Sequence, residues 1–106
     1  MGQQLTTSEK EAAYLSEIVS ILREALPEAR YRLYLFGSRA TGRATGTSDL
    51  DIGVRADAPV ERELSLARER IESSNVPLHV DLVDLATAGE TLIREVESEG
   101  ILLWTN

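Results

Sequence analysis

The chain has 106 residues, 42% of them hydrophobic, so it is expected to fold as one domain, residues 1–106, rather than stay disordered. Its formal net charge of -7 argues against a long nucleic acid as partner, because an acidic surface repels phosphate backbones. It has no cysteine, which excludes disulfides and thiolate metal sites, and no apolar run approaches the length of a membrane span. These features predict a soluble, cytoplasmic protein.

The N-terminal region predicts one helix. Residues 1–7 are polar and are expected to be loose. Ser8 and Glu11 have the spacing of a capping box, in which a hydroxyl and a carboxylate satisfy the first backbone N–H groups of a helix. Apolar residues then recur at helical intervals as far as Leu26, and Pro27 predicts the end of the helix.

The rest of the chain predicts alternating strands and helices. Short aromatic and aliphatic runs indicate strands, and apolar stripes with helical spacing indicate helices. This order predicts an α+β (α/β) fold, with a mixed sheet of about four strands, helices packed on one face and the other face partly open for a site. The predicted elements are strands at 31–36, 49–54, 78–83 and 101–104, a turn or loop at 38–47, and helices at 57–71 and 87–99.

Two aspartates at the start of the second predicted strand form a candidate metal site. Asp49 and Asp51 are two positions apart, so on a strand both carboxylates project from one face. Neighbouring carboxylates repel each other unless a cation lies between them, and oxygen ligands of this kind suit Mg²⁺. A lone pair of this spacing often arises by chance, so the pair alone is a weak indication.

Asp81 is the third candidate ligand. Alternation along its strand puts it on the face opposite its apolar neighbours. If that face also carries Asp49 and Asp51, three carboxylates meet, as a transfer that uses two metal ions requires. Asp84, at the end of the same strand, is predicted to be a turn or helix-cap residue, and the single histidine, His79, is given no catalytic role.

A glycine–serine turn between the first two strands is a candidate phosphate site. Gly37 has no side chain to keep a phosphate from the backbone, and the Ser38 hydroxyl can add a hydrogen bond. Arg39 and Arg43 are cations in the same loop that could reach phosphate oxygens, and Ser48 completes the predicted nucleotide-binding set. A plain hairpin loop also explains the glycines, but not why the turn leads into a strand with paired carboxylates.

The spacing of these motifs resembles a known pattern. Gly37-Ser38, ten intervening residues and Asp49-Leu50-Asp51 resemble the DNA polymerase β-like nucleotidyltransferase superfamily. The small size makes the chain similar to the minimal nucleotidyltransferases, the MntA-type antitoxins paired with HEPN-domain toxins. Residues 78–84 resemble the strand that carries the family's third carboxylate, and the resemblance runs from about residue 30 to the C-terminus.

This resemblance implies a magnesium-dependent transfer of AMP from ATP, with release of pyrophosphate. Gly37 and Ser38 would hold the nucleotide phosphates, and Asp49 and Asp51 would bind two Mg²⁺ ions. Asp81 would bind the catalytic ion and help to activate the acceptor hydroxyl. In MntA-type members the acceptor is a tyrosine of the HEPN toxin, an RNase that the modification silences. The implied partner is therefore a HEPN-domain toxin in a hetero-oligomer.

Two other functions stay open from the sequence. The same enzyme chemistry could serve a small-molecule hydroxyl, such as that of an aminoglycoside, in a site completed by a second copy of the chain. Alternatively, the chain could be a non-catalytic module that neutralises a toxin by covering it, although the filled aspartate positions count against a degenerate site. Larger superfamily members carry a second, helical domain for which this chain has no room, and this favours a site completed by a partner. Acceptor residue, number of AMP units, base selectivity and oligomeric state are left open.

Overall fold

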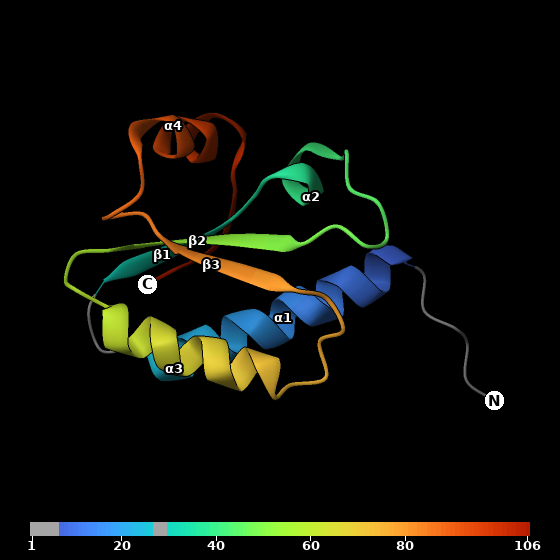
Figure 1. Ribbon diagram of the computed structural model, residues 1–106, viewed down its shortest axis with the longest axis horizontal. Helices are drawn as coiled ribbons and strands as arrows, with labels where there is room; N and C mark the ends of the chain where they lie inside the picture. Colours follow the sequence, from blue (N-terminus) through green and yellow to red (C-terminus); the bar gives the residue numbers. More distant parts are fainter. Residues whose placement is uncertain (1–6, 27–29) are drawn as a thin grey trace.

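Four strands and four helices follow one another in the computed structural model, which describes residues 7–26 and 30–106 (Figure 1). The first strand has the predicted bounds, and the other predicted strands and helices are present with shifted ends. The elements are α1 (Thr7–Ala25), β1 (Tyr31–Phe36), α2 (Ser38–Thr41), β2 (Leu50–Ala56), α3 (Glu61–Glu72), β3 (Val80–Asp84), α4 (Glu90–Glu99) and β4 (Ile101–Thr105).

The strands form one mixed sheet in the order β3-β2-β1-β4, which confirms the predicted fold class. β1 pairs antiparallel with both β2 and β4, and β2 pairs parallel with β3. The α3 helix makes the long connection that a parallel pair needs, between β2 and β3. The parallel register sets Asp51 directly beside Asp81.

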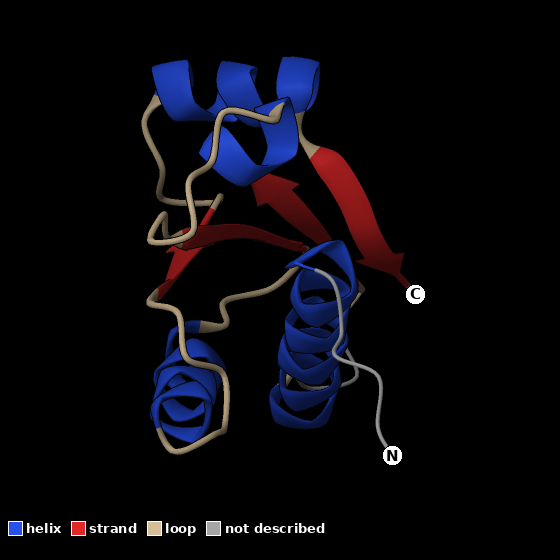
Figure 2. Ribbon diagram, turned by 90° about the vertical axis from the view of Figure 1, so that its right-hand side faces the viewer, coloured by secondary structure: helices blue, strands red, loops and turns tan. Residues whose placement is uncertain are grey.

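The two faces of the sheet are covered differently. The long helices α1 and α3 lie side by side on one face, as predicted, and enclose the main core (Figures 1 and 2). The shorter α4 lies over part of the opposite face, which the sequence pattern did not indicate, and α2 stands at the edge of that face (Figure 2). Val96 of α4 packs there against Phe36 and Leu85 in a second, smaller core. The fully buried residues of the main core are Ile18, Leu22, Leu33, Leu50, Ile52, Val54, Val60, Leu64 and Ala67.

The start of the first helix differs from the prediction. Thr7 is already helical, and Ser8 lies inside the helix rather than at its cap. The predicted capping box is therefore wrong: the Glu11 carboxylate forms an ion pair with Arg39 at 3.0 Å. Residues 1–6 and Pro27 lie outside the described residues. None of the helices in residues 7–26 and 30–106 has the length and hydropathy needed to cross a bilayer.

Candidate active site

Alternation along β2 separates the core from the candidate site. Leu50, Ile52 and Val54 are fully buried and face α1 and α3. Asp51 lies between them and therefore projects from the opposite face. Since Asp51 and Asp81 are register partners on parallel strands, their side chains are neighbours on that face, with strands about 4.8 Å apart. The predicted juxtaposition of these two carboxylates is thus present in the fold.

Asp49 immediately precedes β2 and is exposed. The next residue, Leu50, donates its backbone N–H to the carbonyl oxygen of His79 at 2.9 Å, which fixes the beginning of β2 beside β3. Asp49 is near enough to Asp51 for its negative charge to act on that side chain. The three predicted aspartates therefore belong to one end of the open face.

The neighbouring carboxylates destabilise the charged state of Asp51. The pKa of Asp51 is raised above its ordinary value of 3.8, first because burial disfavours the charge and then because Asp81 and Asp49 repel it. Glu95 of α4 adds to the same effect, whereas His79 opposes it. Glu95 was missed from the sequence, because its only signal is its position in a helix whose packing was unknown. A bound cation would relieve this repulsion.

The fit to a metal ion rests on the type of donor. Within residues 7–26 and 30–106, no three acidic, histidine or cysteine side chains already converge in a geometry that could hold a metal ion. Mg²⁺ does not need such a cage, because it usually takes one or two protein carboxylates and completes its shell with water and substrate phosphate. The paired carboxylates on this face meet that requirement.

Gly37 brings the turn after β1 against the Asp51 carboxylate. Its φ of 75° lies in the region that favours glycine, and a Cβ atom built at this position would overlap Asp51 Oδ2. Phe36, the residue before it, is the register partner of Asp51. Glycine is therefore required here both by backbone conformation and by the space that the carboxylate occupies.

The predicted loop at 38–47 begins with a single helical turn, α2. Gly37 accepts hydrogen bonds at its carbonyl oxygen from the backbone N–H groups of Ala40 and Thr41, at 3.1 and 3.2 Å. Gly42, with φ of 77°, ends the turn in the left-handed conformation. The Ser38 hydroxyl makes no hydrogen bond with the part of the chain that the structure describes, so it remains available to a ligand.

The guanidinium of Arg39 makes its hydrogen bonds to groups of the protein itself. Its Nε and Nη2 donate to the carbonyl oxygen of Ser48, at 3.0 and 2.8 Å, and its Nη1 donates to Glu11 Oε2 at 3.0 Å. The side chain is 5% exposed. The sequence predicted that Arg39 binds nucleotide phosphate; in the structure its guanidinium is enclosed by groups of the protein itself.

The other two polar residues predicted to bind nucleotide from this loop, Ser48 and Arg43, differ in their contacts. Ser48 Oγ accepts the backbone N–H of Thr45 at 2.9 Å, so its hydroxyl supports the turn at 45–48 instead of facing a ligand. Arg43 is exposed, and its side chain has no hydrogen bond or ion pair with the described residues. Arg43 is therefore the loop cation whose donors are not used by the described residues. Asp84, as predicted, serves a turn, because its Oδ1 accepts the Ala86 N–H at 3.0 Å.

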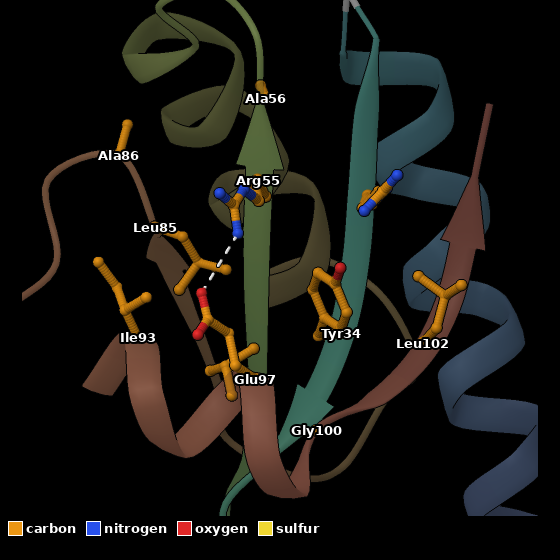
Figure 3. Close-up of a pocket in the computed structure, with 11 residues that line it drawn as sticks. Tyr34, Arg55, Ala56, Leu85, Ala86, Ile93, Glu97, Gly100 and Leu102 are labelled. Carbon is orange, nitrogen blue, oxygen red and sulfur yellow. Dashed lines mark ion pairs between the residues drawn. The ribbon is translucent and has the colours of Figure 1, made fainter. Parts of the chain in front are cut away.

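Two cavities lie beside the sheet, and one of them includes a candidate carboxylate. One, of about 420 Å³, lies toward the C-terminal end of β2, where Arg55 forms an ion pair of 3.7 Å with Glu97 beside Leu85 and Tyr34 (Figure 3). Another, of about 360 Å³, includes Asp81 at its border, beside α3. Neither contains Asp49 or Asp51. Asp49 and Asp51 thus lie outside both of these cavities, whereas Asp81 borders the second.

Comparison with known proteins finds a matching family and similar chains. A family model described as polymerase beta, nucleotidyltransferase, matches residues 16–106. The chain is 36% identical over 89 residues to the probable protein adenylyltransferase MntA of Haemophilus influenzae, covering 77% of this chain and 74% of that protein. It is 33% identical over 89 residues to the protein adenylyltransferase MntA of Shewanella oneidensis, covering 84% of this chain and 63% of that protein.

Solved structures show the same likeness. A chain of a toxin–antitoxin crystal structure with AMP-PNP matches with a TM-score of 0.71 and 33% identity, over 87% of this chain and 73% of that chain. A chain from the complex of the tri-AMPylated Shewanella oneidensis HEPN toxin with its MNT antitoxin matches with a TM-score of 0.69 and 28% identity, over 91% of this chain and 73% of that chain.

Proposed function

The chain belongs to the polymerase beta nucleotidyltransferase family, and from this we propose that it transfers AMP from ATP to a hydroxyl of a HEPN-domain toxin, as the antitoxin of a toxin–antitoxin pair. The relatives named protein adenylyltransferase support AMP transfer, and the complex of an AMPylated HEPN toxin with its antitoxin supports the partner. The observation that carries the proposal is the register of Asp51 with Asp81, beside the bare backbone of Gly37.

In this proposal one group of residues binds the nucleotide phosphates and another binds the metal ions. Gly37 and Ser38 receive the nucleotide phosphates, through the unobstructed backbone and the available hydroxyl, and Arg43 contacts phosphate oxygens from the loop. Asp49 and Asp51 hold two Mg²⁺ ions together with the third aspartate, Asp81 of β3. When bound, these ions supply charge neutralisation of the triphosphate and a lower pKa for the acceptor hydroxyl.

The transfer itself is a substitution at phosphorus. The acceptor oxygen forms a bond to the α-phosphorus, while the bond from that phosphorus to the bridging oxygen breaks and pyrophosphate leaves. Asp81 is exposed on the open face, where its carboxylate can take the proton released by the acceptor. Gly37 and Ser38 keep the phosphates in line for the attack.

We infer that a partner presents the acceptor, because Asp49 and Asp51 lie outside both cavities and leave the acceptor side of the site open. We take the acceptor to be a tyrosine, whose long side chain can reach across from another protein, and the assembly to be a hetero-oligomer of antitoxin and toxin. The lack of cysteine fits a reducing cytoplasm as the place where the pair acts.

The test uses the double variant Asp49→Asn with Asp51→Asn, incubated with the toxin, Mg²⁺ and ATP labelled on the α-phosphate. We expect no transfer of label to the toxin, with an unchanged circular dichroism spectrum, because the ion ligands are lost and the core face is untouched. Asp57→Asn, an exposed aspartate beyond the far end of β2, is the matched control and should transfer label normally. Persistent labelling by the double variant contradicts the metal assignment.

The same variant separates enzyme from binding module. If catalysis neutralises the toxin, cells that express the toxin with the double variant should stop growing, whereas cells with wild-type protein should grow. Rescue by a variant that transfers no label shows that covering the toxin is enough, and it contradicts the catalytic role of the antitoxin.

A further inference from the structure

The loop at 45–48 is exposed along most of its length and is held mainly from one side. Within the loop, Ser48 N–H donates to Thr45 O at 3.1 Å, and Thr45 N–H donates to Ser48 Oγ at 2.9 Å. Both bonds close the turn on itself. The hydrogen bonds that join this loop to other parts of the described chain come from Arg39, which donates to Thr45 O at 3.2 Å and to Ser48 O at 2.8 and 3.0 Å.

The residue that follows this loop is Asp49, and its backbone is fixed on both sides. On one side the Ser48 carbonyl oxygen accepts two bonds from the Arg39 guanidinium. On the other side Leu50 N–H donates to His79 O at 2.9 Å. The position of the Asp49 carboxylate therefore depends on a strand contact and on one arginine.

Arg39 also connects the two halves of the site. It is the residue after Ser38, so its backbone belongs to the glycine–serine turn, while its guanidinium holds the carbonyl that leads into Asp49. The Glu11 carboxylate of α1 accepts from the remaining end of the guanidinium at 3.0 Å. The Glu11 side chain is 26% exposed, so its ion pair with Arg39 is partly shielded from water.

On the premise of the proposed function, we propose that Arg39 is a positioning residue: it holds Asp49 at a fixed distance from the Gly37–Ser38 turn through the carbonyl of Ser48, and it does not bind the nucleotide. Residues that orient a metal ligand typically change metal affinity or activity by about 10- to 100-fold when they are removed. A planar guanidinium suits this task, because it can donate in several directions at once, which a lysine ammonium does not reproduce.

The experiment compares four variants of the full chain. Arg39→Gln removes the guanidinium that holds the Ser48 carbonyl. Arg39→Lys keeps the charge but loses the branched set of donors. Arg43→Gln removes the exposed cation of the same loop, and Arg62→Gln, an exposed residue of α3 on the other side of the sheet, is the neutral control. For each we measure kcat and KM for ATP, the Mg²⁺ concentration for half-maximal rate, and hydrogen–deuterium exchange of the amides at 45–49.

We expect Arg39→Gln to lower kcat about 10- to 100-fold, to raise the Mg²⁺ requirement and to leave KM for ATP within about threefold. Arg39→Lys should recover part of kcat. Arg43→Gln should instead raise KM for ATP with little change in kcat, and Arg62→Gln should change neither. Exchange at 45–49 should accelerate in the Arg39 variants alone. A rise in KM for ATP in Arg39→Gln, with unchanged exchange and Mg²⁺ requirement, overturns the inference in favour of direct nucleotide binding.

Two further outcomes are separated by the design. If the wild-type chain transfers no AMP, the proposed function fails. The positioning role of Arg39 is then still tested by the exchange rates and by calorimetric measurement of Mg²⁺ binding. If Arg39→Gln does not fold, the milder Arg39→Lys decides: normal exchange at 45–49 with normal kcat overturns the inference, and faster exchange with reduced kcat upholds it.

Discussion

The two faces of β2 alternate residue by residue and yet have opposite characters. Leu50, Ile52 and Val54 are fully buried under α1 and α3, whereas Asp51 faces the open end of the sheet and is surrounded by like charges. A single strand thus carries core packing on one side and the candidate chemistry on the other. The strand can tolerate the repulsion of Asp51 by its neighbours, because its reverse side is fully packed.

The largest effect should come from removing a carboxylate on the open face. Asp81→Asn should lower kcat/KM for AMP transfer at least about 1000-fold, equivalent to about 4 kcal/mol, because a charged ligand of the reacting centre is lost. Melting temperature should change little, since Asp81 is exposed. Asp84→Asn is the matched control on the same strand, because asparagine can still accept the Ala86 N–H. A loss of less than tenfold in Asp81→Asn contradicts the role given to this aspartate.

The reverse pattern should follow from a change on the packed face. Ile52→Ala should reduce the free energy of unfolding by about 2–5 kcal/mol, because it opens a cavity at a fully buried position. At a temperature where the variant remains folded, its AMP-transfer rate should stay close to wild type. Urea unfolding followed by circular dichroism measures the first quantity. Arg55→Gln, on the other face of the strand, should shift stability by less than about 0.5 kcal/mol.

The contact between the glycine turn and the open face is tested by Gly37→Ala. The added Cβ would overlap Asp51 Oδ2, and the backbone φ of 75° is strained for alanine. We expect a loss of about 1–3 kcal/mol in stability, together with reduced AMP transfer as the carboxylate is displaced. Gly46→Ala provides the comparison, because the space around its Cβ is open and its φ is not in the left-handed region. Equal behaviour of the two variants in thermal melting would show that the crowding at residue 37 has no energetic consequence.

The smallest predicted effect concerns the charge of Asp51. Burial and the neighbouring carboxylates raise its pKa, so ionisation costs more in the folded than in the unfolded chain. Stability from this group is complete below the unfolded pKa and is lost as pH rises through the folded pKa. Without Mg²⁺ at pH 7, Asp51→Asn should therefore melt a few degrees above wild type.

Addition of Mg²⁺ should reverse that order. Wild-type melting temperature should rise, because the ion relieves the repulsion, while the variant should respond weakly. The difference without Mg²⁺ should also shrink as pH is lowered toward 4, where the wild-type carboxyl becomes protonated. Differential scanning fluorimetry across pH, with and without Mg²⁺, measures all three quantities. A variant that melts below wild type at pH 7 without Mg²⁺ would contradict the sign of this argument.

Much of the fold was predictable because it depends on local alternation. The bounds of β1 follow from its run of aromatic and large apolar residues, and the two-residue period gives the face of Asp51 and of Asp81 within each one's own strand. The parallel register between β2 and β3 was not predictable, because it is set by how α3 packs across the sheet. The placement of α4 on the opposite face was missed for the same reason: a helical stripe shows that a helix is buried on one side, and not on which layer.

In the candidate site, too, local features were predictable from the sequence and non-local contacts were not. The aspartates and Gly37 were found from type and spacing, which their chemistry requires. The contacts of Arg39 were not predictable, because an arginine near a phosphate-friendly turn looks the same in sequence whether its donors are free or used. Only the fold brings Glu11 and the Ser48 carbonyl to its guanidinium. Glu95 reaches Asp51 for an equally non-local reason, since it comes from a helix far along the chain.

The central position of β1 has a consequence for how the chain folds. One neighbour, β2, follows after the connection at 37–49, whereas Leu33 pairs with Trp104 of β4, about 70 residues further along. Closing so long a loop is entropically costly and slow, so this pairing should form late. Until β4 arrives, the edge of β1 presents unpaired backbone groups to other chains. The period of greatest aggregation risk for this protein therefore lies in the interval between the β1–β2 hairpin and the docking of its last strand.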